Sequence, residues 1–286
     1  MRSGEVRRLS GKAGGSTLTL KARNDSLKNI SKTLNADNLH VANLGELKIK
    51  HVERYIEIQR EKGVSDRTLQ NRMTHLRTVL KELGRHQMAA HERLSSKGLG
   101  IAGANRDGTH RALSPDAAAQ VFEAAKSVNA GFVACLVMQR ELGLRAREAV
   151  QSVDSLRVWL RALERGHAVR VIHGTKGGKA RDTTPIDRER ALEAVKTALA
   201  VSVVNGGVLM RGKTLEAAMQ AFHRDCAKVG LTGVNASHCL RYGYAQERFA
   251  QLLVQLGDRK EALAATSVEL GHGDGRGTYI AQVYLK

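Results

Sequence analysis

The chain has few aromatic residues and few cysteines. Among its 286 residues are one Trp, five Tyr and four Phe. So few rings argue against a surface that binds nucleic acid by stacking bases on aromatic side chains. Cys135, Cys226 and Cys239 are odd in number, far apart and outside any CxxC pair, so neither a disulfide framework nor a zinc site is indicated. They fit a reducing compartment, and we expect a cytoplasmic protein, associated with the nucleoid when bound to DNA.

Long hydrophobic runs are also missing. The longest, FVACLVM at residues 132–138, is too short to cross a bilayer. The N-terminal stretch, residues 1–16, is basic and rich in Gly, and it lacks the apolar core of a signal peptide. We therefore expect a soluble protein with no membrane partner and a flexible basic N-terminus over residues 1–16.

Acidic residues are few relative to basic ones. Lys and Arg number 46 against 28 Asp and Glu, which gives a formal net charge of +18. Residues 1–108 hold 21 basic and 11 acidic residues, and residues 109–286 hold 25 and 17, so the excess is not confined to one tail. Such an excess favours a polyanionic partner, with a well-solvated surface as the alternative.

Amphipathic helices dominate the first third of the chain. In residues 65–84, apolar residues recur at alternating spacings of four and three, with Ser65 placed to cap the start and Gly84 to end the helix. The stripe consists of Leu69, Met73, Leu76, Leu80 and Leu83. Residues 45–63 have a similar pattern, and the two segments predict an antiparallel pair in a helical domain over residues 17–100. Four basic residues outside the stripe either contact phosphates or form a solvated surface: Arg67, Arg72, Arg77 and Lys81.

A Gly-rich, aperiodic stretch separates this domain from the rest. This stretch is SSKGLGIAGANRDGTH, residues 95–110, and we expect its last part, residues 101–110, to link the domains. Ser114 and Pro115 then mark a helix start, since Ser caps helices and Pro suits the first helical position. We place a second domain at residues 111–286.

One segment of the second domain predicts strands. In residues 168–186, alternating apolar residues precede a Gly-rich turn and a second short run, which indicates a β-hairpin with its tip at residues 175–179. Lys176 and Lys179 lie in that tip. The fold class expected is therefore mainly α with a small β-hairpin, an α+β arrangement.

Four short stretches carry the candidate chemistry. In SHCLRYGYAQ, residues 237–246, His238 and Arg241 are three apart at a helix start, so they share one helix face. ELGLRAREAV holds Arg145, with Glu148 one turn later to hold it. The segments ELGHGDG and TYIAQVYLK contain the remaining candidates, His272, Tyr279 and Tyr284. Each alone has an ordinary structural explanation, but their order is harder to dismiss.

In that order, the motifs resemble those of the tyrosine recombinases of the phage integrase family. GLRAREAV is similar to the first arginine motif, HCLRYGYA to the His-x-x-Arg motif, and LGHGDG with VYLK to the segment of the second histidine and the nucleophilic tyrosine. The match spans about residues 110–286. The preceding helices are similar, less specifically, to the N-terminal core-binding domain of that family.

The residue types suit metal-free cleavage of a phosphodiester. That reaction needs a nucleophile, donors to the charged phosphoryl oxygens and an acid for the leaving 5′ oxygen. Arg145 and Arg241 offer planar forks that match phosphate oxygens. His238 is assigned as the base or proton carrier at the nucleophile, and His272 as a hydrogen-bond partner of the phosphate. No cofactor is expected, since neither a P-loop nor an acidic metal cluster is present.

The resemblance implies the remaining roles. Lys176 is the general acid, with Lys179 as the substitute because the register of the turn is open. Tyr284 forms a 3′-phosphotyrosyl bond, with Tyr279 as its competitor because the loop after His272 looks longer than usual. The implied partners are double-stranded DNA clamped between the two domains, a homo-tetramer in the synaptic complex and accessory DNA-bending factors.

The resemblance also implies a function, integration or excision of a mobile element by a site-specific DNA recombinase. The sequence departs from the family at Tyr242, where His is common after the second arginine. Three alternatives stay open: a catalytically inactive, basic DNA-binding module, an enzyme with type IB-like topoisomerase activity and, ranked last, an RNA-binding protein.

Overall fold

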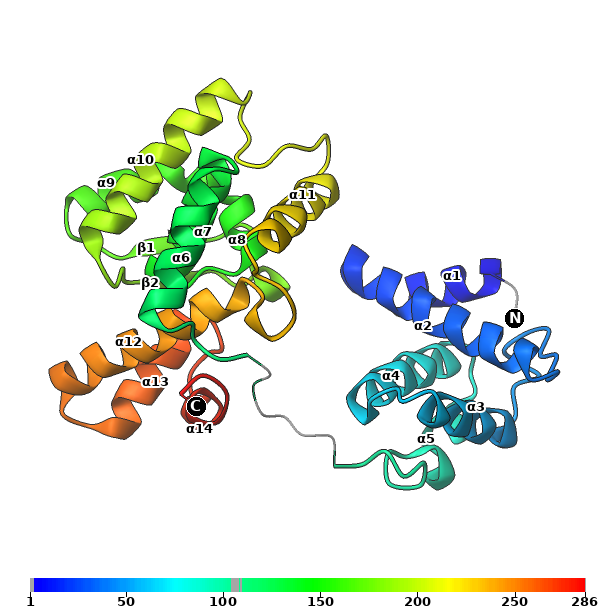
Figure 1. Cartoon of the computed structure of the whole chain (residues 1–286). Helices are drawn as coiled ribbons and strands as arrows, with labels where there is room; N and C mark the ends of the chain where they lie inside the picture. The colour runs from blue at the N-terminus through cyan, green and yellow to red at the C-terminus, as the bar shows by residue number, and fades with distance from the viewer. Residues whose placement is uncertain (1–2, 104–107, 109, 286) are drawn as a thin grey trace. The chain divides into compact units, whose positions relative to one another are not determined.

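The chain divides into two compact units, residues 1–106 and residues 107–286, in a computed structural model. The structure describes residues 3–103, 108 and 110–285. Each unit is considered by itself (Figure 1). The described residues contain no helix that is both long and apolar enough to cross a membrane.

The first unit is helical throughout its described elements. In chain order these are α1 (Ser3–Lys12), α2 (Thr17–Ala36), α3 (Ile49–Glu61), α4 (Asp66–Glu82), α5 (His86–Ala90) and the short 3₁₀ helix η1 (Glu92–Leu94). The helix predicted over residues 65–84 is α4, which packs against α2, and its Leu and Met stripe is buried except for Leu83, the half-buried C-cap. Ser65 caps it, because the Ser65 hydroxyl accepts a hydrogen bond from the Thr68 amide.

The N-terminal segment is not uniformly flexible, in contrast to the expectation for residues 1–16. Residues 3–12 form α1, and Val6 and Leu9 on this helix are buried in the core of the first unit. The buried Arg23 of α2 donates to the Ser10 carbonyl at 2.6 Å and to the Gly14 carbonyl at 3.1 Å. These contacts fix a segment whose composition alone suggests freedom.

Two of the basic residues of α4 serve the fold itself. Arg72 donates to Asn29, Tyr55 and Gln59 at 2.9, 3.0 and 2.7 Å. Arg77 donates to the Leu94 carbonyl at 3.0 Å. Neither side chain is thus only a solvated charge.

The second unit contains further helices and the only sheet among the described residues. Its elements are α6 (Pro115–Lys126), α7 (Ala130–Glu141), α8 (Ala146–Val150), η2 (Ser152–Ser155), α9 (Leu156–Glu164), β1 (Val169–Val171), η3 (Lys176–Gly178), β2 (Arg181–Thr183), α10 (Arg188–Val204), α11 (Leu215–Lys228), η4 (Gly233–Asn235), α12 (His238–Leu256), α13 (Arg259–Glu269) and α14 (Gly277–Val283). The mainly α class with one small hairpin is confirmed.

The core of the second unit surrounds α7. This helix is apolar on nearly every side, and Phe132, Cys135, Leu136 and Met138 are completely buried. A helix of that composition has to lie inside a domain. Helix α10 packs along it, and α6 covers part of it after the predicted Ser114 cap.

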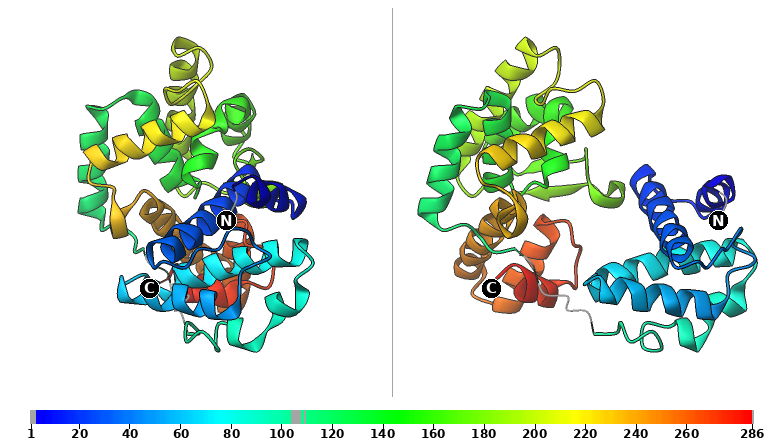
Figure 2. Two further views of the ribbon diagram at one scale, coloured as in Figure 1. Left: turned by 90° about the vertical axis from the view of Figure 1, so that its right-hand side faces the viewer. Right: turned by 45° about the vertical axis from the view of Figure 1, so that its right-hand side comes forward.

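The hairpin forms as expected from the alternating pattern. Strands β1 and β2 pair antiparallel, with Val169 opposite Thr183 and Val171 opposite Arg181. The indole Nε1 of Trp159 donates to the Arg170 carbonyl at 2.8 Å, which ties β1 to α9. The connection between the strands stands out from the helices of this unit (Figure 2, right).

The C-terminal elements of the second unit form a separate buried cluster that positions the candidate site. Helices α12, α13 and α14 pack together around Tyr244, Leu270, Ile280 and Tyr284. The views of Figures 1 and 2 agree that α14 lies beside α13. This packing brings the segment at Leu270 against Arg145, near the middle of the chain.

The proposed linker is shorter than residues 101–110. Ile101 is completely buried in the core of the first unit. His110 belongs to the second unit, where its Nδ1 lies 2.8 Å from the Val234 carbonyl oxygen. Residues 104–107 and 109 lie outside the described residues.

Candidate active site

The turn between α7 and α8 places the first arginine. Gly143 has φ +58°, and a Cβ atom there would lie 2.4 Å from the Tyr244 ring, so this position requires glycine. The turn ends at Arg145, which is the N-cap of α8. The predicted contact with Glu148 is present: Arg145 Nη1 donates to Glu148 Oε1 at 2.7 Å, and the Arg145 amide donates to Oε2 at 2.8 Å.

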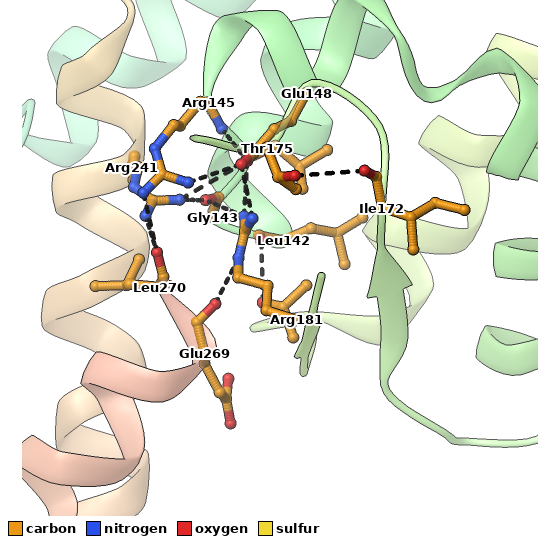
Figure 3. Close-up of polar contacts among 12 residues, drawn as sticks. Leu142, Gly143, Arg145, Glu148, Ile172, Thr175, Arg181, Arg241, Glu269 and Leu270 are labelled. Atoms are coloured by element: carbon orange, nitrogen blue, oxygen red, sulfur yellow. Dashed lines mark hydrogen bonds and ion pairs between the residues drawn. The ribbon is translucent and has the colours of Figure 1, made fainter. Parts of the chain in front are cut away.

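The Glu148 carboxylate is completely buried and has a second arginine partner (Figure 3). Arg181 Nη1 and Nη2 donate to its two oxygens, each at 2.7 Å. Burial alone would raise the pKa of Glu148. The hydrogen bond and charge of Arg181, with the charges of Arg241 and Arg145, outweigh burial and lower that pKa to about 2. Glu148 is therefore ionised across the neutral pH range.

The second predicted arginine, Arg241, lies on the first turn of α12 and has no exposed surface. Its guanidinium donates to the carbonyls of Gly143 and Leu270. Arg145 Nη2 donates to the same Leu270 carbonyl at 3.3 Å. The structure thus brings together the two arginines, which are 96 positions apart in sequence. Arg241 Nε is buried without a hydrogen-bond partner among the described residues.

The charges at this site are unbalanced. Three guanidiniums, those of Arg145, Arg181 and Arg241, surround the single carboxylate of Glu148. Burial and the charge of Arg241 lower the pKa of Arg145. An anion with several acceptor oxygens, such as a phosphodiester, matches this arrangement.

Both predicted histidines lie beside the predicted nucleophile. His272 Nε2 is 3.1 Å from the Tyr284 phenolic oxygen, and the His238 ring centroid is 6.3 Å from that of Tyr284. The sequence interpretation assigned His238 to the nucleophile, but the structure gives the hydrogen bond to His272. Burial, followed by the charge of Arg241, lowers the pKa of each imidazole to about 3, so both are neutral near pH 7.

Tyr279 lies in the same site as Tyr284. Its ring centroid is 4.9 Å from that of His272 and 6.3 Å from that of Tyr284. Burial and the charge of Tyr284 raise the pKa of Tyr279, while the charges of Arg241 and Arg145 oppose that rise. Tyr284 is 2% exposed, and its hydroxyl hydrogen-bonds with His272 Nε2.

Lys176 and Lys179 are exposed at the hairpin tip, as predicted. Burial and the charges of Arg241 and Arg145 lower the pKa of His272, and the charge of Lys176 adds a smaller effect in the same direction. Because the tip projects from the unit, Lys176 has room to reach a bound substrate.

Sequence reasoning missed two residues of the site. Arg181 lies outside the four motifs, and no local spacing connects it to Glu148. His110, which the sequence placed in the linker, packs its ring 5.6 Å from that of His238 and 6.0 Å from that of Tyr242. The sequence offered one signal for Arg181, its basic side chain in the second short run of the predicted hairpin.

Comparisons with known proteins agree with this architecture. The family model described as Integrase matches residues 100–247, and the one described as Phage integrase, N-terminal, matches residues 2–89. No curated protein matches the chain.

Solved structures share the fold at low sequence identity. The Tn1549 transposon integrase in complex with transposon right end DNA has a TM-score of 0.60 and 15% identity, over 98% of this chain and 94% of that one. A lambda integrase dimer bound to a COC′ core site has a TM-score of 0.58 and 16% identity, over 97% of this chain and 75% of that one. Because the matching integrase model alone spans more than half of the chain, the chain belongs to the integrase family, whose members are tyrosine-type site-specific recombinases.

Proposed function

We propose that this recombinase cuts and rejoins DNA strands at a specific site through a 3′-phosphotyrosyl intermediate on Tyr284, and that it integrates or excises a mobile element. The observation that carries the proposal is the 3.1 Å contact between His272 Nε2 and the Tyr284 hydroxyl, beside two arginines that share one carbonyl. DNA as the partner is supported by relatives with the same fold that were solved as DNA complexes.

Cleavage is a displacement at phosphorus. The Tyr284 oxygen attacks the scissile phosphorus, and the bond between phosphorus and the 5′ oxygen breaks. The phenolic proton passes to His272, which is neutral in the free site and becomes more basic when the negative phosphate offsets the charges of Arg241 and Arg145. Lys176 gives a proton to the leaving 5′ oxygen. The reverse sequence joins a 5′ hydroxyl to the phosphotyrosine and frees the enzyme. These groups supply nucleophile, base and acid, so the step draws on no metal or nucleotide.

Arg145 and Arg241 stabilise the charge that develops on the non-bridging phosphoryl oxygens. Removing one such donor typically costs 10²–10³-fold in rate. Arg241 Nε lacks a partner in the described residues, which leaves it available to a phosphate oxygen. Because Arg241 has no exposed surface, this role requires the site to open when DNA binds. His238, whose ring packs against Tyr242, is assigned as a further donor to the phosphate.

We assign a tetramer to the working complex. A lambda integrase tetramer bound to a Holliday junction has the same fold, with a TM-score of 0.58 and 16% identity. Four copies of this chain on two duplexes would exchange strands in pairs. Both units are basic, so each is expected to contact the DNA backbone, and affinity should fall steeply with salt.

The test is covalent capture. Wild type, Tyr284→Phe and Tyr279→Phe are incubated with supercoiled DNA that carries the sequence flanking this gene, quenched with detergent and examined for protein-linked DNA. We expect adducts with wild type and Tyr279→Phe and none with Tyr284→Phe, while all three bind DNA equally.

Other outcomes select an alternative. Adducts that disappear only in Tyr279→Phe would move the nucleophile to Tyr279. An absence of adducts on DNA that the protein binds would favour an inactive DNA-binding module. Relaxation of arbitrary plasmids without recombination would favour topoisomerase activity.

A further inference from the structure

Arg181 connects three segments of the candidate site. It lies on β2 and is 5% exposed. Its Nη1 and Nη2 hold both oxygens of Glu148, its Nε donates to the Glu269 carbonyl at 2.8 Å, and Nη2 also reaches the Gly143 carbonyl at 3.4 Å. In Figure 3 the Arg181 side chain extends from its strand between Glu148 and Glu269.

Each oxygen of Glu148 serves both arginines. Oε1 accepts from Arg145 Nη1 and Arg181 Nη1, both at 2.7 Å, while Oε2 accepts from the Arg145 amide and Arg181 Nη2. The fork of Arg181 fixes the plane of the carboxylate, because two parallel bonds allow little rotation. The same carboxylate then fixes the direction of the Arg145 guanidinium.

The hydrogen bond from Arg181 Nε to the Glu269 carbonyl holds the segment on the other side of the site. Glu269 precedes Leu270, whose carbonyl accepts hydrogen bonds from both Arg145 and Arg241. A Cβ atom on Gly271 would lie 2.9 Å from Arg181 Cδ, so the chain passes closely over this side chain. Arg181 therefore holds the segment before His272 as well as the carboxylate that orients Arg145.

We infer that Arg181 is a positioning residue for DNA cleavage, which acts by holding Glu148 so that the Arg145 guanidinium faces the scissile phosphate. This rests on the proposed function. Arg181 does not touch the phosphate itself, since its fork is occupied by Glu148. A buried ion pair that only supported the fold would change stability and leave the action of Arg145 alone.

The experiment measures single-turnover cleavage with Arg181→Lys and Arg181→Gln, each alone and combined with Arg145→Ala. Arg170→Gln is the matched control, because Arg170 lies on the paired strand and its ion pair with Asp182 is exposed. Fluorescence anisotropy of labelled DNA establishes the protein concentration at which each variant is saturated, and cleavage is measured there. The fluorescence of Trp159 checks that the second unit is folded.

We expect Arg181→Lys to slow cleavage roughly 100-fold, the cost typical of misplacing a reacting group by about 1 Å. Lys keeps one charge beside Glu148 but cannot hold two oxygens and the Glu269 carbonyl together. In the Arg145→Ala background the same substitution should slow cleavage by less than about tenfold, because only its hold on the segment before His272 is left to lose. Arg170→Gln should cleave at the wild-type rate.

The outcomes separate this inference from the proposed function. Equal slowing by Arg181→Lys in both backgrounds, or wild-type cleavage by that variant, would overturn it. Loss of native Trp159 fluorescence in both Arg181 variants would also overturn it, since the residue would then be needed for the fold itself. Failure of covalent capture by wild type and by Arg170→Gln would instead sink the proposed function.

Discussion

Replacing Glu148 by Gln should destabilise the second unit by about 3 kcal/mol at pH 7. Gln keeps the size of the side chain but removes the charge that the arginines surround. The pKa of Glu148 is about 2 in the folded chain against an ordinary value of 4.5, and this difference corresponds to about 3 kcal/mol. A similar figure, about 3–5 kcal/mol, is typical when one partner of a buried ion pair is removed.

The single tryptophan makes the assay specific. Trp159 lies in the second unit and is 2% exposed, so its fluorescence follows the unfolding of residues 107–286 in the intact chain. Urea titrations of wild type and Glu148→Gln at pH 7 give the difference in free energy of unfolding. The control is Glu123→Gln, because Glu123 forms an exposed ion pair with Lys126 and should change stability by less than about 1 kcal/mol.

The pH dependence supplies the refutation. A carboxyl whose folded pKa lies below its unfolded pKa contributes full stability above the unfolded value and loses that contribution as pH falls towards the folded value. The advantage of wild type over Glu148→Gln should therefore shrink as pH falls from about 5 towards 2. A difference below about 1 kcal/mol at pH 7, or one that stays constant with pH, would refute the assignment of Glu148 as the shared anion.

Three further predictions concern other parts of the chain. Leu76→Ala should destabilise the first unit by about 2–5 kcal/mol, since Leu76 is fully buried, and should leave urea unfolding monitored by Trp159 unchanged because the second unit has its own core. Arg72→Ala should destabilise the first unit by about 2 kcal/mol, since the buried Gln59 and Tyr55 side-chain oxygens lose this donor, and hydrogen exchange over residues 49–82 should speed up accordingly. His272→Gln should reduce the loss of stability that the second unit shows between pH 6.5 and 4, measured by the same fluorescence. The pKa of His272 is about 3 in the folded chain, so the unfolded chain binds the proton first and wild type loses stability as pH falls through that range. A wild-type slope in that variant would contradict the assigned pKa.

Most of the helix predictions depended on capping residues and on the spacing of apolar residues, which are local features of the sequence. The caps at Ser65 and Ser114 depend on neighbours within a few residues, so the sequence alone shows them. The contact between Arg145 and Glu148 is likewise a three-residue relation on one helix. Such features need no knowledge of tertiary structure.

The missed features all depend on distant partners. Arg181 meets Glu148 across 33 positions and the Glu269 carbonyl across 88, and no periodicity records either contact. Helix α1 is ordered by burial of Val6 and Leu9 against helices that follow it, while its own composition resembles a flexible tail. Which histidine hydrogen-bonds with Tyr284 also depends on tertiary structure, because the loop after α13 brings the His272 imidazole to the phenol.

The surplus of guanidinium groups around Glu148 also sets a limit on the stability of the free protein. Arg145, Arg181 and Arg241 repel one another in a buried space, and the single carboxylate offsets only part of that repulsion. The site illustrates how the requirements of activity and of stability diverge at one set of residues, with the missing countercharge left for the substrate to bring.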